Sequence, residues 1–364
     1  MKATQRLHAL GQSLWLDNIT REMLINGTLR RYIDDFEITG LTSNPTIFDH
    51  AIRNGSFYDD SIRRKSAAGQ SGEELFIDLA LEDLAQAADL FAPVHEATGG
   101  VDGWVSMEVS PLLADDTAGS VREAKRLQAR GRRSNLFIKI PGTPAGVPAI
   151  EEAIFAGVPI NVTLLFSREQ YVASANAYLR GIERRIEAGL DPRVDSAASL
   201  FVSRWDVAVK DKVSHDLRNR LGIAIAKRTY KAYREMLASP RWRRVASAGA
   251  RLQRLLWAST GTKDPDAPDT LYIEALAAPD TIITIPDKTL LALADHGQVE
   301  GVLPIDGGDA ERVIAEFRRA GVDDEAVAKQ LQIEGTLTFD KAWRELLDCI
   351  AAKRKALKTV ATGD

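Results

Sequence analysis

Residues 135–167 read NLFIKIPGTPAGVPAIEEAIFAGVPINVTLLFS, two apolar segments separated by a segment with helical spacing. The first apolar segment, residues 136–140, is rich in strand-forming residues. Pro148 suits the first turn of a helix, where its missing N–H costs nothing, and Gly157 is a typical helix stop. The second apolar segment, residues 159–166, completes a β-α-β unit. Its two strands are therefore predicted to be parallel and buried on both faces.

Lys139 interrupts the first of these apolar strands, and a buried lysine needs an explanation. Desolvation disfavours the ammonium form of a lysine and makes a free, nucleophilic amine accessible, as imine formation requires. A lysine at a strand end can equally extend its head group to solvent or pair with a carboxylate. Lys139 alone does not decide between these interpretations, so the rest of the chain must.

Size and composition exclude several classes of protein. The chain has 364 residues, a net charge of −4 and a pI near 5.9, which argue against general nucleic-acid binding. Cys349 is the only cysteine, so no disulfide forms within the chain. There is no signal-peptide pattern and no apolar run of membrane-spanning length, so no membrane association is expected and a cytoplasmic location is the default. The scattered histidines and the lack of a glycine-rich phosphate loop predict no metal and no cofactor.

Strand-like and helix-like segments alternate along most of the chain. The expected strands are 13–19, 38–44, 104–109, 136–140, 159–166, 199–204, 255–259 and 281–285. This alternation predicts an α/β fold, a closed (β/α)₈ TIM-type barrel, with a doubly wound open sheet as the alternative. The last part of the chain looks purely helical, with helices expected at 310–320, 324–334 and 339–358. We therefore expect one domain over residues 1–364, with a helical extension from about 308–364.

Most of the expected strands carry polar residues where apolar ones would be usual. These are Asp17, Thr42, Asn44, Glu108, Lys139, Asn161, Thr163, Ser199, Arg204 and Ser259, with Lys263 just beyond. Each has a structural alternative: Asp17 could cap the next helix, Asn44 could turn the chain, and Glu108 could pair with a barrel lysine. Because active sites of such barrels lie at the C-terminal ends of the strands, the whole set is expected to converge there.

The residue types suggest one chemistry. A lysine amine attacks a carbonyl, one carboxylate carries protons, and a second carboxylate with a threonine can hold a water molecule. Arg204, Ser259 and Lys263 would form a cationic, donor-rich edge that suits a phosphate dianion. With no metal-ligand pattern in the sequence, a protonated imine is the expected electron sink. The set therefore predicts Schiff-base carbon–carbon chemistry on a phosphorylated sugar.

Three motifs resemble those of the transaldolase family within the class I Schiff-base aldolases. They are GLTSNPTIF at 40–48, LFIKIPGT at 136–143 and NVTLLFS at 161–167, and the resemblance extends over about residues 10–296. The chain length and WASTGTKDP at 257–265 look most like the longer bacterial subfamily. The resemblance implies transfer of a dihydroxyacetone unit from sedoheptulose 7-phosphate to glyceraldehyde 3-phosphate. The products would be erythrose 4-phosphate and fructose 6-phosphate, in the non-oxidative pentose phosphate pathway.

The resemblance also implies roles for individual residues. Lys139 would form the Schiff base with the ketose C2, and Asp17 would take and return the proton of the C4 hydroxyl. Glu108 and Thr163 would hold the water used in imine formation and release. The implied or expected substrate contacts are Thr42, Asn44, Asn161, Ser199, Phe201, Arg204 and Ser259. Many shorter transaldolases have an arginine soon after the serine equivalent to Ser259, and Lys263 is expected to replace it here.

Two other functions remain open from the sequence. A related aldolase would release dihydroxyacetone instead of transferring it. Such relatives tend to have a tyrosine where this chain has Phe201, which favours transfer. A non-catalytic binding barrel would be expected to lose the lysine or its carboxylates, and this chain retains them. Oligomeric state is not indicated by the sequence.

Overall fold

The computed structural model describes residues 2–361 and contains one sheet of eight parallel strands. The strands follow one another around the sheet in the order β2-β1-β8-β7-β6-β5-β4-β3. Their bounds are β1 (Ser13–Leu16), β2 (Ile38–Leu41), β3 (Val105–Glu108), β4 (Leu136–Pro141), β5 (Ile160–Leu165), β6 (Ser196–Phe201), β7 (Gln253–Ala258) and β8 (Ile282–Ile285). All eight are buried along their whole length, as expected of parallel strands covered by helices.

The two end strands of this order meet and close the sheet. Gly40 on β2 forms a parallel bridge with Trp104, just before β3, and the Leu41 N–H donates to the Trp104 carbonyl at 2.9 Å. A Cβ atom on Gly40 would lie 2.7 Å from the Trp104 carbonyl oxygen and from the Trp15 ring. Only glycine therefore permits this approach. The closure confirms the predicted (β/α)₈ barrel and excludes the open sheet.

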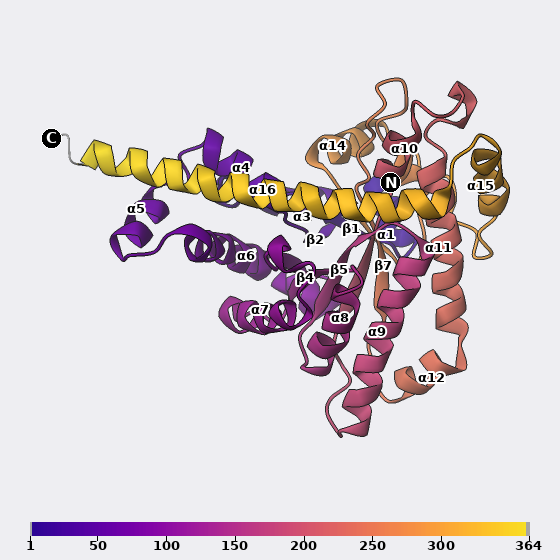
Figure 1. Cartoon of the computed structure of the whole chain (residues 1–364), viewed down its shortest axis with the longest axis horizontal. Helices are drawn as coiled ribbons and strands as arrows, with labels where there is room; N and C mark the ends of the chain where they lie inside the picture. Colours follow the sequence, from indigo (N-terminus) through magenta and orange to yellow (C-terminus); the bar gives the residue numbers. More distant parts are fainter. Residues whose placement is uncertain (1, 362–364) are drawn as a thin grey trace.

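Helices surround the barrel and connect its strands (Figure 1). Their bounds are α1 (Ala3–Ala9), α2 (Arg21–Ile25), α3 (Thr28–Phe36), α4 (Pro45–Asn54), α5 (Asp59–Ala67), α6 (Gly72–Ala97), α7 (Thr117–Gly131), α8 (Gly146–Phe155), α9 (Arg168–Glu187), α10 (Ser203–Val209), α11 (Leu221–Ala238), α12 (Pro240–Ser247), α13 (Leu271–Ala275), α14 (Asp287–His296), α15 (Ala310–Arg319) and α16 (Asp324–Ala361), with 3₁₀ turns η1 (Pro111–Leu113) and η2 (His215–Leu217). Within residues 2–361, no helix is both long and apolar enough to cross a membrane.

The sixth strand differs from its predicted position. It begins at Ser196 and ends at Phe201, so Arg204 lies on helix α10 and not on the strand. The small residues at 196–198 carry little strand signal of their own. They are extended because they pair with both β5 and β7 over this stretch. Tertiary pairing thus overrides the weak local preference.

The C-terminal region also differs from prediction, because residues 324–361 form a single helix. The expected interruption near Gly335 does not occur. A Cβ atom on Gly335 would come within 3.0 Å of the Leu164 side chain, so this glycine serves close packing. Figure 1 shows α16, in yellow, as the longest helix, and it packs on α4, α5, α6, α10 and β5.

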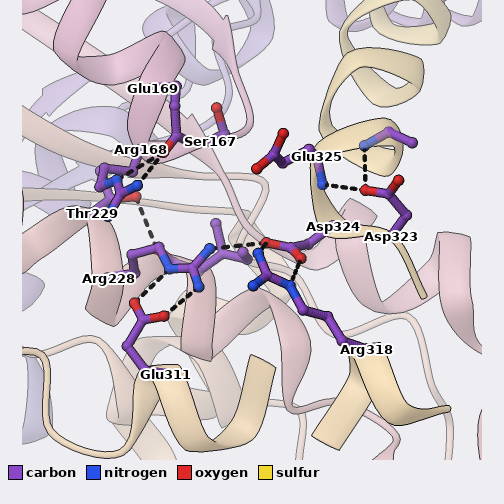
Figure 2. Close-up of polar contacts among 12 residues, drawn as sticks. Ser167, Arg168, Glu169, Arg228, Thr229, Glu311, Arg318, Asp323, Asp324 and Glu325 are labelled. Atoms are coloured by element: carbon purple, nitrogen blue, oxygen red, sulfur yellow. Dashed lines mark hydrogen bonds and ion pairs between the residues drawn. The ribbon is translucent and has the colours of Figure 1, made fainter. Parts of the chain in front are cut away.

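An ionic network around the buried Asp324 side chain fixes the start of α16 (Figure 2). Arg228 on α11 donates from Nη1 to Asp324 Oδ2 at 2.9 Å and from Nε to Glu311 Oε1 at 2.7 Å. Arg318 on α15 donates from Nη2 to Asp324 Oδ2 at 3.0 Å. The Asp324 side chain is only 4% exposed, so its charge is balanced almost entirely by these two guanidinium groups. The network joins α11, α15 and α16.

Candidate active site

A cavity of about 590 Å³ lies at the C-terminal ends of the strands. Most of the predicted site residues line it: Asp17, Thr42, Asn44, Lys139, Thr163, Ser199, Phe201, Arg204, Ser259 and Lys263. Glu108 and Asn161 do not border this cavity, but they flank Lys139 on the neighbouring strands. Residues on or just after seven of the eight strands, β1 to β7, thus lie at this end of the barrel, as the barrel geometry predicts.

Lys139 forms a close ion pair with Glu108 at the base of the cavity. The two residues occupy the same register position on β4 and β3, and the Lys139 Nζ lies 2.6 Å from Glu108 Oε1. Both side chains are 8% exposed, and Lys139 also donates to the Ser43 carbonyl at 3.1 Å. Burial raises the pKa of Glu108, while the positive charge of Lys139 opposes that rise. The sequence left open that Lys139 pairs with a carboxylate. It does pair with Glu108, and this pair lies within the candidate site.

Thr163 and Glu108 border a second, much smaller cavity next to Lys139. Its volume is about 20 Å³, and a cavity of roughly 10–15 Å³ can hold one water molecule. Among residues 2–361, neither the Thr163 hydroxyl nor a Glu108 oxygen has a hydrogen-bond partner of good geometry, although Glu108 retains its ion pair. Because buried polar atoms are normally hydrogen-bonded, these groups are suited to hold a water beside the lysine.

Asp17 faces the main cavity directly after β1. The Thr42 hydroxyl donates to Asp17 Oδ1 at 2.9 Å, which holds the carboxylate toward the cavity. Asp17 does not cap the following helix, because Thr20 caps α2 by accepting from the Met23 N–H. The capping alternative for Asp17 is therefore wrong.

Asn44 and Asn161 are held by the fold in different ways. Asn44 caps α4, since its Oδ1 accepts from the Ile47 N–H at 3.1 Å. Its amide nitrogen donates no hydrogen bond within residues 2–361 and so remains available to a ligand. Asn161 is fully buried and accepts a hydrogen bond from the Ser199 hydroxyl at 2.7 Å. It lies in register with Lys139 on the adjacent strand, and its amide nitrogen donates to the Ser106 hydroxyl at 3.3 Å.

A group of cations and hydroxyls lines the cavity wall where β6 and β7 end. Arg204 stands over the Phe201 ring at 5.5 Å and forms no ion pair within residues 2–361, and burial lowers its pKa. The Ser259 hydroxyl lies 2.9 Å from that of Ser203. Lys263 is exposed at the rim. This wall offers donors and positive charge to an anion.

Sequence reasoning missed one backbone feature and one group of residues at the site. Ser259 itself was predicted, but no pattern in the sequence signals its φ of +56°, a left-handed conformation that is uncommon for non-glycine residues. The cavity is also lined by three residues of the C-terminal helix α16: Thr338, Phe339 and Ala342. They lie far from the strand motifs in sequence, so only folding brings them to the site.

A (β/α)₈ barrel with a buried lysine–carboxylate pair beneath a polar cavity defines a barrel enzyme whose site suits imine chemistry. The family model for transaldolase/fructose-6-phosphate aldolase matches residues 14–350. This chain therefore belongs to the transaldolase/fructose-6-phosphate aldolase family.

Curated relatives match nearly the whole chain. A transaldolase of Thiobacillus denitrificans is 44% identical over 355 residues, covering 95% of this chain and 99% of its own length. A transaldolase of Thermobifida fusca is 44% identical and covers 97% of this chain and 98% of its own. A protein named transaldolase 2 from a Nostoc species is 37% identical and covers 96% and 97%.

Proposed function

We propose that this protein is a transaldolase, which moves a dihydroxyacetone unit from sedoheptulose 7-phosphate to glyceraldehyde 3-phosphate. Erythrose 4-phosphate and fructose 6-phosphate are the products, and the reaction belongs to the non-oxidative pentose phosphate pathway. The full-length similarity to proteins named transaldolase supports this reaction. We also propose a cytoplasmic location, which the family assignment supports. The observation that carries the mechanism is the Lys139–Glu108 pair beside the unpartnered Thr163 hydroxyl.

Imine formation uses this pair. The neutral Lys139 amine attacks the C2 carbonyl of the ketose to give a carbinolamine, which loses its hydroxyl as water and becomes a protonated imine. Glu108 lies 2.6 Å from the amine, close enough to take the proton of the ammonium and to give one to the departing hydroxyl through a water. Its raised pKa brings its protonated form closer to neutral pH, which suits this exchange.

Carbon–carbon cleavage uses Asp17, which lines the cavity directly after β1. Asp17 takes the proton of the C4 hydroxyl, the C3–C4 bond breaks, and its electron pair moves into the protonated imine to give an enamine. The first aldehyde leaves. The enamine then attacks the carbonyl carbon of the second aldehyde, and Asp17 returns the proton to the new hydroxyl. The hydrogen bond from Thr42 supports this role by fixing the carboxylate.

The remaining site residues are proposed to bind substrate. Asn44, Asn161 and Ser199 lie near the lysine and suit the sugar hydroxyls and the enamine. Arg204, Ser259 and Lys263 suit the phosphate, because charged donors bind phosphate oxygens strongly. Arg204 lines the cavity from α10. It forms no ion pair within residues 2–361, which leaves its charge for the ligand.

The second candidate is an aldolase that releases dihydroxyacetone. Phe201 is the observation that bears on it, because this ring lines the cavity and carries no hydroxyl that could position a further water. The apolar ring protects the enamine from protonation and supports transfer over release.

Borohydride trapping tests the proposal. The purified protein is incubated with fructose 6-phosphate and borohydride, and the adduct is located by intact-mass and peptide analysis. Lys139→Met is the test variant, and Lys65→Met, at a lysine paired with Asp78 and Glu82 away from the cavity, is its control. We expect a reduced dihydroxyacetone adduct on Lys139 in the wild type and the control only. In a parallel reaction without borohydride and without an acceptor aldehyde, free dihydroxyacetone should appear only slowly. Rapid release would support the aldolase, and the absence of any adduct would exclude the Schiff-base mechanism.

A further inference from the structure

Gln332, on the C-terminal helix α16, connects the two strands that carry Lys139 and Thr163. Its Nε2 donates to the carbonyl of Gly142, just after β4, and to the carbonyl of Leu164 on β5, both at 3.0 Å. These two carbonyl groups lie 190 and 168 residues away in sequence. The side-chain amide of Gln332 thus donates two hydrogen bonds to backbone carbonyls that lie close in sequence to Lys139 and Thr163.

Leu164 has an unusual backbone conformation. Its φ is +58°, and the pairing of β5 with β6 is irregular between Val162 and Leu165. The left-handed region is unfavourable for a leucine, so the conformation persists only where its surroundings impose it. Because Leu164 directly follows Thr163, this irregularity also determines where the Thr163 hydroxyl points.

Helix α16 supplies the surroundings that impose this conformation. The buried Leu164 side chain packs against Gly335, one turn after Gln332, where a Cβ atom would come within 3.0 Å of it. On the other side of the same segment, the Gly142 N–H donates to the Thr163 carbonyl at 2.7 Å. Gln332 therefore joins a small hydrogen-bonded unit that contains Gly142, Thr163 and Leu164.

We propose that Gln332 is a positioning residue for imine formation and hydrolysis. It holds the Leu164 carbonyl in its left-handed turn and thereby keeps the Thr163 hydroxyl directed at the small cavity beside Lys139 and Glu108. This inference rests on the proposed role of Thr163 in holding the water for imine chemistry. Gln332 does not border the main cavity, so its loss affects the water-dependent steps more than the binding of the sugar phosphate.

The test variant is Gln332→Leu, which removes both donors at similar size. Gln330→Leu is the matched control, because Gln330 lies on the same helix and donates only to exposed Glu334. The rate of borohydride-trapped adduct formation on Lys139 is measured at saturating fructose 6-phosphate, with KM and thermal unfolding alongside. We expect the trapping rate to fall about 10- to 100-fold in Gln332→Leu, as for a misplaced catalytic group, with KM changed less than about twofold. Gln330→Leu should match the wild type.

Gln332→Glu provides a second measurement that does not depend on the leucine variant folding. An ionised glutamate cannot donate to either carbonyl, whereas its protonated form can donate to one. The trapping rate of this variant, relative to wild type, should therefore rise as pH falls. Trapping at the wild-type rate in both Gln332 variants, or equal slowing in Gln330→Leu, would overturn the proposal. If the wild type itself forms no adduct on Lys139, the proposed function fails instead.

Discussion

Lys139 and Glu108 lie at the same register position on adjacent strands, with the ammonium nitrogen 2.6 Å from the carboxylate. Both side chains are more than nine-tenths buried, so neither charge is balanced by bulk solvent. A lysine in such a pair can lose its proton directly to its neighbour. The pair is therefore both the structural explanation for a charge inside the barrel and the proposed starting point of the reaction.

Glu108→Gln should slow imine formation while largely preserving the fold. The amide keeps the size of the side chain and can accept a hydrogen bond from Lys139, but it cannot exchange a proton. We expect the trapping rate on Lys139 to fall about 100- to 1,000-fold, the usual effect of losing a general acid–base group. Glu152→Gln, which removes only a surface ion pair to Arg184, is the control. A trapping rate for Glu108→Gln equal to that of the control would contradict the assignment.

Arg204→Ala and Lys263→Ala should differ in their effect on phosphate binding. Arg204 is half-buried and has no ion-pair partner among the described residues, 2–361. Its loss should therefore raise KM for fructose 6-phosphate about 10- to 100-fold, as expected for charged hydrogen bonds worth about 1.5–3 kcal/mol. Lys263 is exposed, and its loss should raise KM only about two- to fivefold, with strong salt dependence. Slow turnover of unphosphorylated fructose is the internal control, because it should be unchanged. A larger effect at Lys263 would reverse the ranking.

Phe201→Tyr should shift the enzyme from transfer toward release. The added hydroxyl would lie in the main cavity and could position a water that protonates the enamine, raising release of dihydroxyacetone from fructose 6-phosphate about 10-fold or more. Phe201→Leu serves as the comparison, since it changes the shape without adding a donor. Release is measured with no acceptor aldehyde present. Equal release from both variants would mean that ring shape, not the hydroxyl, controls the outcome.

Asp324→Asn should destabilise the fold by loosening the start of α16. Burial opposes ionisation, but the hydrogen bonds from Arg318 and Arg228 prevail and hold the pKa of Asp324 below its usual range. Removing this buried charge should lower the free energy of unfolding by about 2–4 kcal/mol at pH 7. Because the native pKa is depressed, this contribution is present above about pH 4 and lost as the pH falls further.

Asp323→Asn is the matched control for that measurement. Asp323 accepts from the N–H groups of Glu325 and Ala326, and asparagine caps helices about as well as aspartate. Urea unfolding at pH 7 should therefore separate the two variants. Equal unfolding free energies for both would show that the network in Figure 2 contributes little.

Asp206 should give the protein a stability component that weakens as the pH rises. Burial raises the pKa of Asp206 to about 6, despite hydrogen bonds from Tyr272, Gly222 and Leu221. The native carboxyl thus keeps its proton up to about pH 6, whereas the unfolded one loses it near pH 4. The native state binds more protons in this window, so the free energy of unfolding falls by up to about 3 kcal/mol as the pH rises through it.

Asp206→Asn tests this assignment because the amide has no charge to bury. Urea unfolding of the wild type and the variant is compared at pH 4.5, 6 and 7.5. The variant should gain stability relative to the wild type as the pH increases. A difference between the two proteins that stays constant over this range would show that Asp206 does not titrate as assigned.

The site residues at the strand ends could be predicted from the sequence because a (β/α)₈ barrel brings these ends together. Regular alternation of strands and helices brings the C-terminal ends of all strands to one place, so Lys139, Asp17, Glu108 and Thr163 could be grouped without coordinates. The position of Arg204 was predicted less well. The small residues that begin β6 carry little strand signal, so the predicted strand, 199–204, lies three residues after the observed one, Ser196–Phe201.

The sequence by itself determined the class of fold, the family and most residues of the candidate site, because these depend on local patterns and on short motifs. The tertiary structure alone decided which partners those residues have. The Lys139–Glu108 contact depends on strand register, and the Gln332 hydrogen bonds join segments 190 and 168 residues apart. Such contacts form only when the whole chain packs. The conformational preferences of neighbouring residues do not determine which side chain will contact a carbonyl group on a distant strand.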